Sequence, residues 1–252
     1  MDPEIDKSPH FTTPDLTEPL LNKLEQTRQE FEYLQYPYLV IHNGDREVPH
    51  ETLHRLKFFY GHIYAVNLPE SFYEEDGFTQ VPIGLENFHW HRNGDLGYFP
   101  DGMSERPKGT VNGVNKRLLM ANFQTSTNPE VREPLRKKLQ TLTGIWQDPT
   151  SDLGSYFESI RNALFVISPE GNGKDCHRTW EAIYLGAIPI IKEKLLSPSL
   201  TDSLPILVVR DWDEVLELEE LELRALAEEI SFKSPTAAYM PYWTARLEKM
   251  FA

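Results

Sequence analysis

Cysteine is almost absent from this 252-residue sequence, since Cys176 is the only one and no disulfide bond can form within the chain. Chains without disulfides are typical of reducing compartments. Long hydrophobic runs are also missing, because no stretch of about 18 consecutive apolar residues occurs. The N-terminus is polar and bears several prolines, and it lacks the pattern of a secretory signal peptide. These absences predict a cytoplasmic protein without a membrane span.

Positive charge is scarce as well, with 25 Lys and Arg residues against 39 Asp and Glu residues and a formal net charge of -14. A surface that follows a nucleic-acid backbone would have to overcome this negative field, so nucleic acid is not expected as a partner. A small anionic ligand in a local cationic pocket stays compatible with the charge. The hydrophobic fraction of 40% is typical of a folded globular chain.

Short apolar runs alternate with helix-like segments along the chain, which predicts an α/β fold with mainly parallel sheets. The expected strands cover residues 38–41, 62–66, 81–84, 118–123, 164–167, 188–191 and 206–209. The expected helices cover residues 20–33, 53–60, 128–142, 155–162, 213–230 and 239–250. The domains that we predict are an extended leader over residues 1–20, a first α/β domain over 21–112, a second over 113–238 and a C-terminal helix over 239–252.

The segment SPEGNGKDCHRTWEAIYLGAIPII, residues 168–191, follows an apolar run and predicts a glycine turn, a helix and a second strand. Gly171 and Gly173 would let backbone N–H groups approach a phosphate, while His177 and Arg178 would supply positive charge. The segment therefore predicts an anion site at the start of the helix.

Glu181, on the expected helix, would accept hydrogen bonds from ribose hydroxyls, because an ionised carboxylate is purely an acceptor. The turn matches neither the G-x-G-x-x-G fingerprint nor the P-loop, which argues against a dinucleotide oxidoreductase. A second interpretation stays open, in which the glycine turn only ends a strand while Arg178 and Glu181 lie on a solvated helix face.

The same segment resembles the donor-binding segment of exostosin-like glycosyltransferases, a GT-B family. Three further segments are similar to parts of that family, namely YLVIHNGD at 38–45, VPIGLENFHW at 81–90 and NKRLLMANFQTSTNPEVR at 115–132. The resemblance implies two Rossmann-like domains facing a central cleft, with a nucleotide diphosphate sugar bound in the second and an acceptor mainly in the first. The implied donor is UDP- or GDP-linked, the implied acceptor is a glycan or glycoprotein, and no cofactor is required.

Carried over residue by residue, the resemblance assigns Glu181 to the ribose of the donor. The diphosphate or the sugar would be held by Ser168, Gly171, Asn172, Gly173, His177 and Arg178. Arg132 would be a second phosphate cation, and Asn122 would line the floor of the cleft.

A sugar transfer with inversion, which the resemblance favours, needs a base beside the acceptor hydroxyl. Asp45 is the first candidate and His42 the second, because both follow the predicted strand 38–41. The alternative is a plain turn, since Asn-Gly is a strong turn dipeptide. Contacts on the acceptor side are expected from Glu86, His89, Trp90 and His91.

Metal binding is the main alternative chemistry. His89 and His91 alternate as ligands on a strand would, but no third ligand is evident nearby. Asp211 and Asp213 match the D-x-D pattern of metal-dependent GT-A transferases, although a helix N-cap is the favoured role for Asp213. We therefore expect a site without metal, in which the cationic turn replaces the ion. A non-catalytic sugar- or nucleotide-binding module is the remaining alternative.

Overall fold

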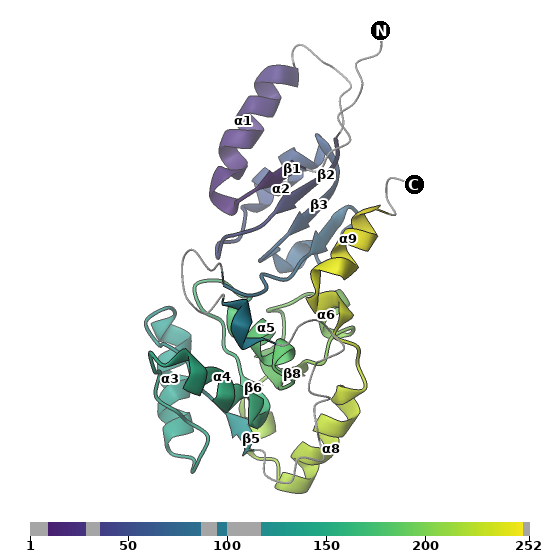
Figure 1. Ribbon diagram of the computed structural model, residues 1–252. Coiled ribbons are helices and arrows are strands. Elements are labelled where there is room, and N and C mark those ends of the chain that lie inside the picture. Colours follow the sequence, from purple (N-terminus) through teal and green to yellow (C-terminus); the bar gives the residue numbers. More distant parts are fainter. Residues whose placement is uncertain (1–9, 29–35, 87–94, 100–116, 249–252) are drawn as a thin grey trace. The chain divides into compact units, whose positions relative to one another are not determined.

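The computed structural model describes residues 10–28, 36–86, 95–99 and 117–248 (Figure 1). Contacts along the chain divide it into two compact units. The first unit comprises Met1–Ile83 together with Asn172–Asp175, and the second comprises Gly84–Gly171 and Cys176–Ala252. The division thus falls before the domain boundary predicted after residue 112, and four residues of the glycine turn group with the first unit.

The first unit contains a four-stranded parallel sheet whose strand order follows the chain. Its strands are β1 (His10–Thr12), β2 (Tyr36–Ile41), β3 (Tyr60–Ala65) and β4 (Phe78–Gln80). Two α-helices, α1 (Thr17–Arg28) and α2 (His50–Lys57), and two 3-10 turns, Pro14–Leu16 and Glu70–Phe72, connect them. Alternate strand residues such as Leu39 and Ile63 pack against Leu21 of α1 and Leu53 of α2, so the helices cover one face of the sheet.

The prediction of an extended leader over residues 1–20 is wrong for residues 10–20, which form β1, a 3-10 turn and the start of α1. The prolines do not prevent this, because Pro14 lies in the first turn of its helix, where a missing N–H costs no hydrogen bond. His10 is held by its neighbours, with Nδ1 2.7 Å from the hydroxyl of Tyr60. Residues 1–9 lie outside the described residues.

The strand predicted over residues 81–84 is also misplaced, since β4 ends at Gln80. Val81 still donates to the carbonyl oxygen of Ala65 (3.0 Å). Pro82 then has no N–H to donate, and Gly84 has a φ of 72°, so the chain leaves the sheet.

The second unit contains another four-stranded parallel sheet, again in chain order. Its strands are β5 (Arg117–Met120), β6 (Ala163–Ile167), β7 (Ile188–Lys192) and β8 (Leu207–Val209). Its α-helices are α3 (Pro129–Gln140), α4 (Leu153–Arg161), α5 (His177–Tyr184), α6 (Pro198–Thr201), α7 (Asp213–Leu216), α8 (Glu220–Ser231) and α9 (Met240–Glu248), with 3-10 turns at Leu96–Tyr98 and Thr236–Ala238. The predicted α/β class with parallel, Rossmann-like sheets is confirmed.

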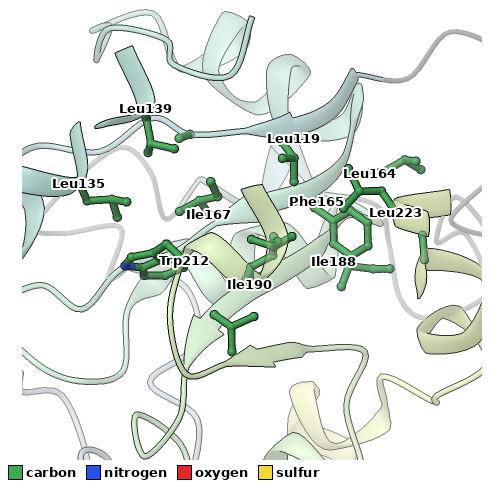
Figure 2. Packing of buried hydrophobic residues seen from close by; sticks show 14 of the residues in the cluster. Leu119, Leu135, Leu139, Leu164, Phe165, Ile167, Ile188, Ile190, Trp212 and Leu223 are labelled. Atoms are coloured by element: carbon green, nitrogen blue, oxygen red, sulfur yellow. The ribbon is translucent and has the colours of Figure 1, made fainter. Parts of the chain in front are cut away.

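Strand β6 is buried along its whole length because helices cover both faces of this sheet. Phe165 and Ile167 belong to a cluster with side chains of α3 and α8, which Figure 2 shows from close by. Val166 points to the other face and packs with side chains of α4 and α5, among them Phe157. This explains why the sequence of β6 is a continuous apolar run rather than an alternating one.

The prediction of a single acidic helix over residues 213–230 is wrong, because the structure has two helices, α7 and α8, in its place. A capping box separates them, in which the side chain of Glu219 accepts from the backbone of Glu222 and Glu222 accepts from the backbone N–H of Glu219 (2.9 Å). Such a box satisfies backbone donors at a helix start, so it begins a new helix here. Among the helices of the described segments, none has the length and apolar character needed to cross a bilayer.

Replacing Phe165 by alanine is expected to lower the free energy of unfolding by about 3–5 kcal/mol, because a fully buried ring is lost and a cavity remains. Urea unfolding followed by circular dichroism measures this change. Leu221→Ala, at a side chain that is 81% exposed, is the control and should change the free energy by less than about 0.5 kcal/mol. Equal effects of both changes would contradict the assignment of this core.

Candidate functional site

The residues predicted for the site fall into three groups. Four lie in the first unit: His42, Asp45, Asn172 and Gly173. Eight lie in the second unit: Glu86, Asn122, Arg132, Ser168, Gly171, His177, Arg178 and Glu181. His89, Trp90 and His91 lie outside the described residues.

The connection from β6 to α5 presents the charged residues of the second unit. Ser168 follows β6 and extends its ladder, because its backbone N–H donates to the carbonyl oxygen of Ile190 (2.9 Å). Its hydroxyl lies 3.0 Å from that of Thr179 on α5. The helix begins at His177, directly after Cys176. The side chains of Arg178 and Glu181 therefore start from the first turns of a helix that follows the carboxyl end of a parallel strand.

Glu181 and Arg178 form a cluster with Tyr156 of α4. Glu181 is only 2% exposed, and the hydroxyl of Tyr156 donates to its Oε2 atom over 2.6 Å. The positive charge of Arg178 acts on the same phenol and lowers its pKa, against the larger effects of burial and Glu181. Burial and the charge of Glu181 raise the pKa of Tyr156 well above its ordinary value, so the phenol stays a donor. The interpretation of Glu181 as part of a solvated helix face is therefore wrong.

A second guanidinium, that of Arg132 on α3, lies beside the same phenylalanine as Arg178. Both guanidinium carbons are 5.7 Å from the ring centroid of Phe123. Burial, and next the charge of Arg178, lower the pKa of Arg132 to about 10. Two guanidinium groups and the carboxylate of Glu181 thus lie in this part of the second unit. The Nε atom of Arg178 is buried without a hydrogen-bond partner in the described part of the chain.

Arg132 is buried, and its nitrogens donate to four protein oxygens. The acceptors are the carbonyl oxygens of Gln124 (2.8 Å), Pro169 (3.0 Å) and Glu170 (2.7 Å) and the hydroxyl of Thr127 (2.6 Å). These bonds tie the loop after β5 to the loop after β6. The observed role of Arg132 is to position both loops, and the phosphate contact assigned to it stays a prediction.

Three further predicted residues of the second unit have protein partners. The Nδ1 atom of His177 donates to the carbonyl oxygen of Gly84 (2.8 Å), since that oxygen can only accept. Its Nε2 atom lies 3.3 Å from Oε2 of Glu86, which brings these two predicted residues together. Asn122 is buried and donates to the carbonyl oxygen of Asp148 (3.2 Å). The ligand contacts assigned to them stay predictions.

The turn residues Asn172–Asp175 are bound by the carboxyl ends of the first unit's strands. Asn172 donates to the carboxylate of Asp45, which follows β2 (3.1 Å). The backbone N–H of Asp175 donates to Asn67, which follows β3 (2.8 Å), and the Asp175 carboxylate accepts from the backbone of Ile83 (2.7 Å). The polar residues at these strand ends thus bind residues 172–175 of the same chain.

The two glycines of the turn are required by neighbouring protein atoms. A Cβ atom at Gly173 would lie 2.5 Å from the carbonyl oxygen of Asp45 and 2.9 Å from the side chain of Asn67. A Cβ atom at Gly171 would lie 2.8 Å from a guanidinium nitrogen of Arg132. Close packing therefore explains both glycines without a ligand, and the predicted approach of their N–H groups to a phosphate stays a prediction.

Both candidate bases also have partners within the first unit. The ring nitrogens of His42 lie 2.9 Å from the side-chain oxygen of Asn43 and 3.1 Å from the carbonyl oxygen of Pro82. Asn43 has a φ of 61°, the left-handed conformation that asparagine adopts in turns. The turn interpretation thus describes the local structure, and the base role of Asp45 or His42 stays a prediction.

Asp211 and Asp213, the pair of the D-x-D pattern, each face a lysine. Asp213 pairs with Lys138, and Asp211 lies 3.7 Å from the ammonium of Lys192. The N-cap residue of α7 is Trp212, so the N-cap role predicted for Asp213 is wrong. Asp213 is the first residue of the helix, and its backbone N–H donates to the carboxylate of Asp211 (3.1 Å). Among the described residues, no group of three or more His, Cys, Asp or Glu side chains has an arrangement suited to a metal ion.

A scan of the sequence against models of protein families found no match, and a search of curated proteins found none either. The geometry of the second unit and the resemblance of the segment 168–191 therefore carry the functional argument.

Two residues that contribute to the cluster, Tyr156 and Phe123, were not predicted from the sequence. Phe123 ends a predicted strand, and Tyr156 lies within a predicted helix. Aromatic residues in such places indicate core packing, and only the tertiary structure shows that one hydroxyl binds a carboxylate. Asn128 is a further case. Its place before a helix indicates a cap, but its side chain donates to the carbonyl oxygen of Gly171 (3.2 Å).

Arg132→Lys is expected to lower the free energy of unfolding by about 2–4 kcal/mol, because an ammonium cannot reach all of the oxygens that the planar guanidinium serves. Equilibrium unfolding in urea measures the loss. Arg136→Lys, on the same helix at a partly exposed pair with Glu133, is the matched control and should change the midpoint much less. A tolerated Arg132→Lys would show that the two loops do not depend on this network.

Gly173→Ala is expected to destabilise the protein by about 1–3 kcal/mol, because the new methyl group overlaps the backbone of Asp45. Gly154→Ala is the control, since its Cβ atom meets nothing closer than 3.4 Å and alanine favours the helix α4. Thermal unfolding should move in opposite directions for the two variants. A shift of Gly173→Ala toward higher temperature would contradict the described packing of the turn.

Proposed function

We propose that this protein is a glycosyltransferase that binds a nucleotide diphosphate sugar, UDP- or GDP-linked, in its second unit. A hydroxyl of a glycan or glycoprotein receives the sugar, and the two units form a GT-B enzyme. The observation that carries the proposal is the cluster of the half-buried Arg178 with the buried Tyr156 and Glu181 at the start of α5, with the guanidinium of Arg132 beside it. The resemblance of residues 168–191 to a donor-binding segment supports the same assignment.

The charges of the cluster suit the chemistry of a nucleotide sugar. As the bond between the anomeric carbon and the phosphate oxygen breaks, negative charge develops on the leaving diphosphate. Preorganised cations stabilise that charge most strongly where water is excluded. Arg178 and Arg132 supply two positive charges, and the backbone N–H groups at the start of α5 add a partial one. Glu181 offers the acceptor that ribose hydroxyls need.

In the proposed reaction, an acceptor hydroxyl forms a bond to the anomeric carbon on the face opposite the diphosphate. Its proton passes to a base, for which Asp45 is the first candidate and His42 the second, and the nucleoside diphosphate leaves with the electron pair. The arginines supply the countercharge, so the proposed reaction needs no divalent ion. Asp211 and Asp213 each have a lysine partner, which favours the arginine cluster over a D-x-D metal site as the donor site.

A second candidate function is a nucleotide-sugar-binding module without catalysis. One observation favours it, namely that the carboxylate of Asp45 and both ring nitrogens of His42 already have protein partners. Release of free nucleoside diphosphate from a bound nucleotide sugar distinguishes the two functions, because only a transferase or its hydrolytic side reaction produces it.

Isothermal titration with UDP, GDP and their sugar conjugates, with and without EDTA, tests the proposed donor site. One nucleotide class should bind with a Kd well below millimolar. In a separate thermal-unfolding measurement, the same nucleotides should raise the melting temperature of the protein by mass action. Arg178→Gln is expected to weaken that binding about 10- to 100-fold, since a charged hydrogen-bond donor to the diphosphate is lost.

Arg136→Gln, which alters an arginine paired with Glu133 on α3, is the matched control and should bind as the unaltered protein does. The proposal fails if no nucleotide binds, or if Arg178→Gln binds the diphosphate undiminished. Binding that disappears in EDTA would instead support a metal-dependent donor site.

A further inference from the structure

Tyr156 contributes a ring and a hydroxyl group to the cluster, and core packing explains only the ring. It lies on α4, is 8% exposed, and its ring centroid is 5.2 Å from that of Phe157. A phenylalanine would fill the same volume and keep this ring contact. The hydroxyl group is therefore the part of the side chain that needs a separate explanation.

The hydroxyl binds the carboxylate of the cluster. Its single proton is given to Oε2 of Glu181 over 2.6 Å, and the charge of Arg178 acts on the same phenol. The carboxylate on α5 is thus attached to an atom of another helix, α4. Because Glu181 has three rotatable side-chain bonds, this hydrogen bond restricts the orientations that its carboxylate can adopt.

We infer that Tyr156 is a positioning residue that orients the carboxylate of Glu181 toward the ribose hydroxyls of the donor nucleotide. The inference rests on the proposed function and adds a specificity determinant to it. Recognition of a hydroxyl by a held acceptor discriminates strongly against an analogue that lacks the hydroxyl, because the buried acceptor is then left unpaired. A carboxylate that is free to rotate discriminates less, since it relaxes toward other donors.

The test compares each nucleoside diphosphate with its 2′,3′-dideoxy form. UDP, GDP and both dideoxy analogues are titrated calorimetrically into the unaltered protein, Tyr156→Phe and Tyr184→Phe. The readout is the ratio of the two Kd values for the base that binds. Tyr184→Phe is the matched control, because it also removes a tyrosine hydroxyl that donates to a protein oxygen, the carbonyl of Ala238, while leaving the cluster intact.

The unaltered protein and Tyr184→Phe should bind the ribose form at least about 10-fold more tightly than the dideoxy form. In Tyr156→Phe this preference should fall to about 3-fold or less, while the affinity for the dideoxy form stays similar. A residue that only supports the fold would change both affinities together and leave the ratio unaltered. In a Glu181→Gln background, Tyr156→Phe should have no further effect on the ratio, because the two residues act through one contact.

Each outcome decides between the two proposals. An unchanged preference in Tyr156→Phe overturns the inference and leaves the nucleotide site standing. A protein that binds both forms equally well overturns the assignment of Glu181 to ribose, and with it the inference. No binding of any nucleotide overturns the proposed function itself.

If Tyr156→Phe does not fold, a measurement on the unaltered protein takes its place, namely the chemical shift of the ¹³Cζ resonance of Tyr156. That resonance should shift with the ribose form and not with the dideoxy form, and equal shifts overturn the inference.

Discussion

The candidate site depends on one buried guanidinium. Arg132 reaches from α3 to carbonyl oxygens of the loop after β5 and of the loop after β6. Loops carry backbone acceptors that a strand ladder no longer satisfies, and buried acceptors without donors are costly. A single planar group with several donors satisfies them together and fixes the distance between the loops. Arg132 also lies beside the start of α5, because one of its terminal nitrogens is 3.6 Å from the sulfur of Cys176, the N-cap residue of that helix.

The arrangement places two positive charges close together, which is electrostatically unfavourable. Burying one guanidinium next to another is unfavourable, which is why the pKa of Arg132 is lowered. Phe123 offsets part of the repulsion, because its ring face attracts both cations. The carboxylate of Glu181 offsets one of the two positive charges. The diphosphate of the proposed donor would offset the other, which is why the arrangement supports that proposal.

The sequence predicts those features that local pattern determines. The run of β6 is apolar throughout because helices cover both sheet faces, so periodicity identifies it directly. Strand β1 has no such pattern, since its three residues are fixed by pairing with β2 and by the bond from His10 to Tyr60. The burial of Glu181 was likewise not predictable, because its partner Tyr156 lies on another helix. Tertiary contacts, rather than propensity, decide such positions.

The glycine turn shows how one residue type can satisfy two different requirements. The sequence predicts that a phosphate approaches the backbone at Gly171 and Gly173, but a side chain at either position would overlap protein atoms. Both requirements demand the absence of a Cβ atom, so the sequence alone cannot separate them. The charged residues can separate the two requirements, because close packing of the glycines does not require a second guanidinium beside Phe123. The proposal of an anionic ligand is therefore supported by Arg178 and by the carboxylate that Tyr156 binds, and not by the two glycines.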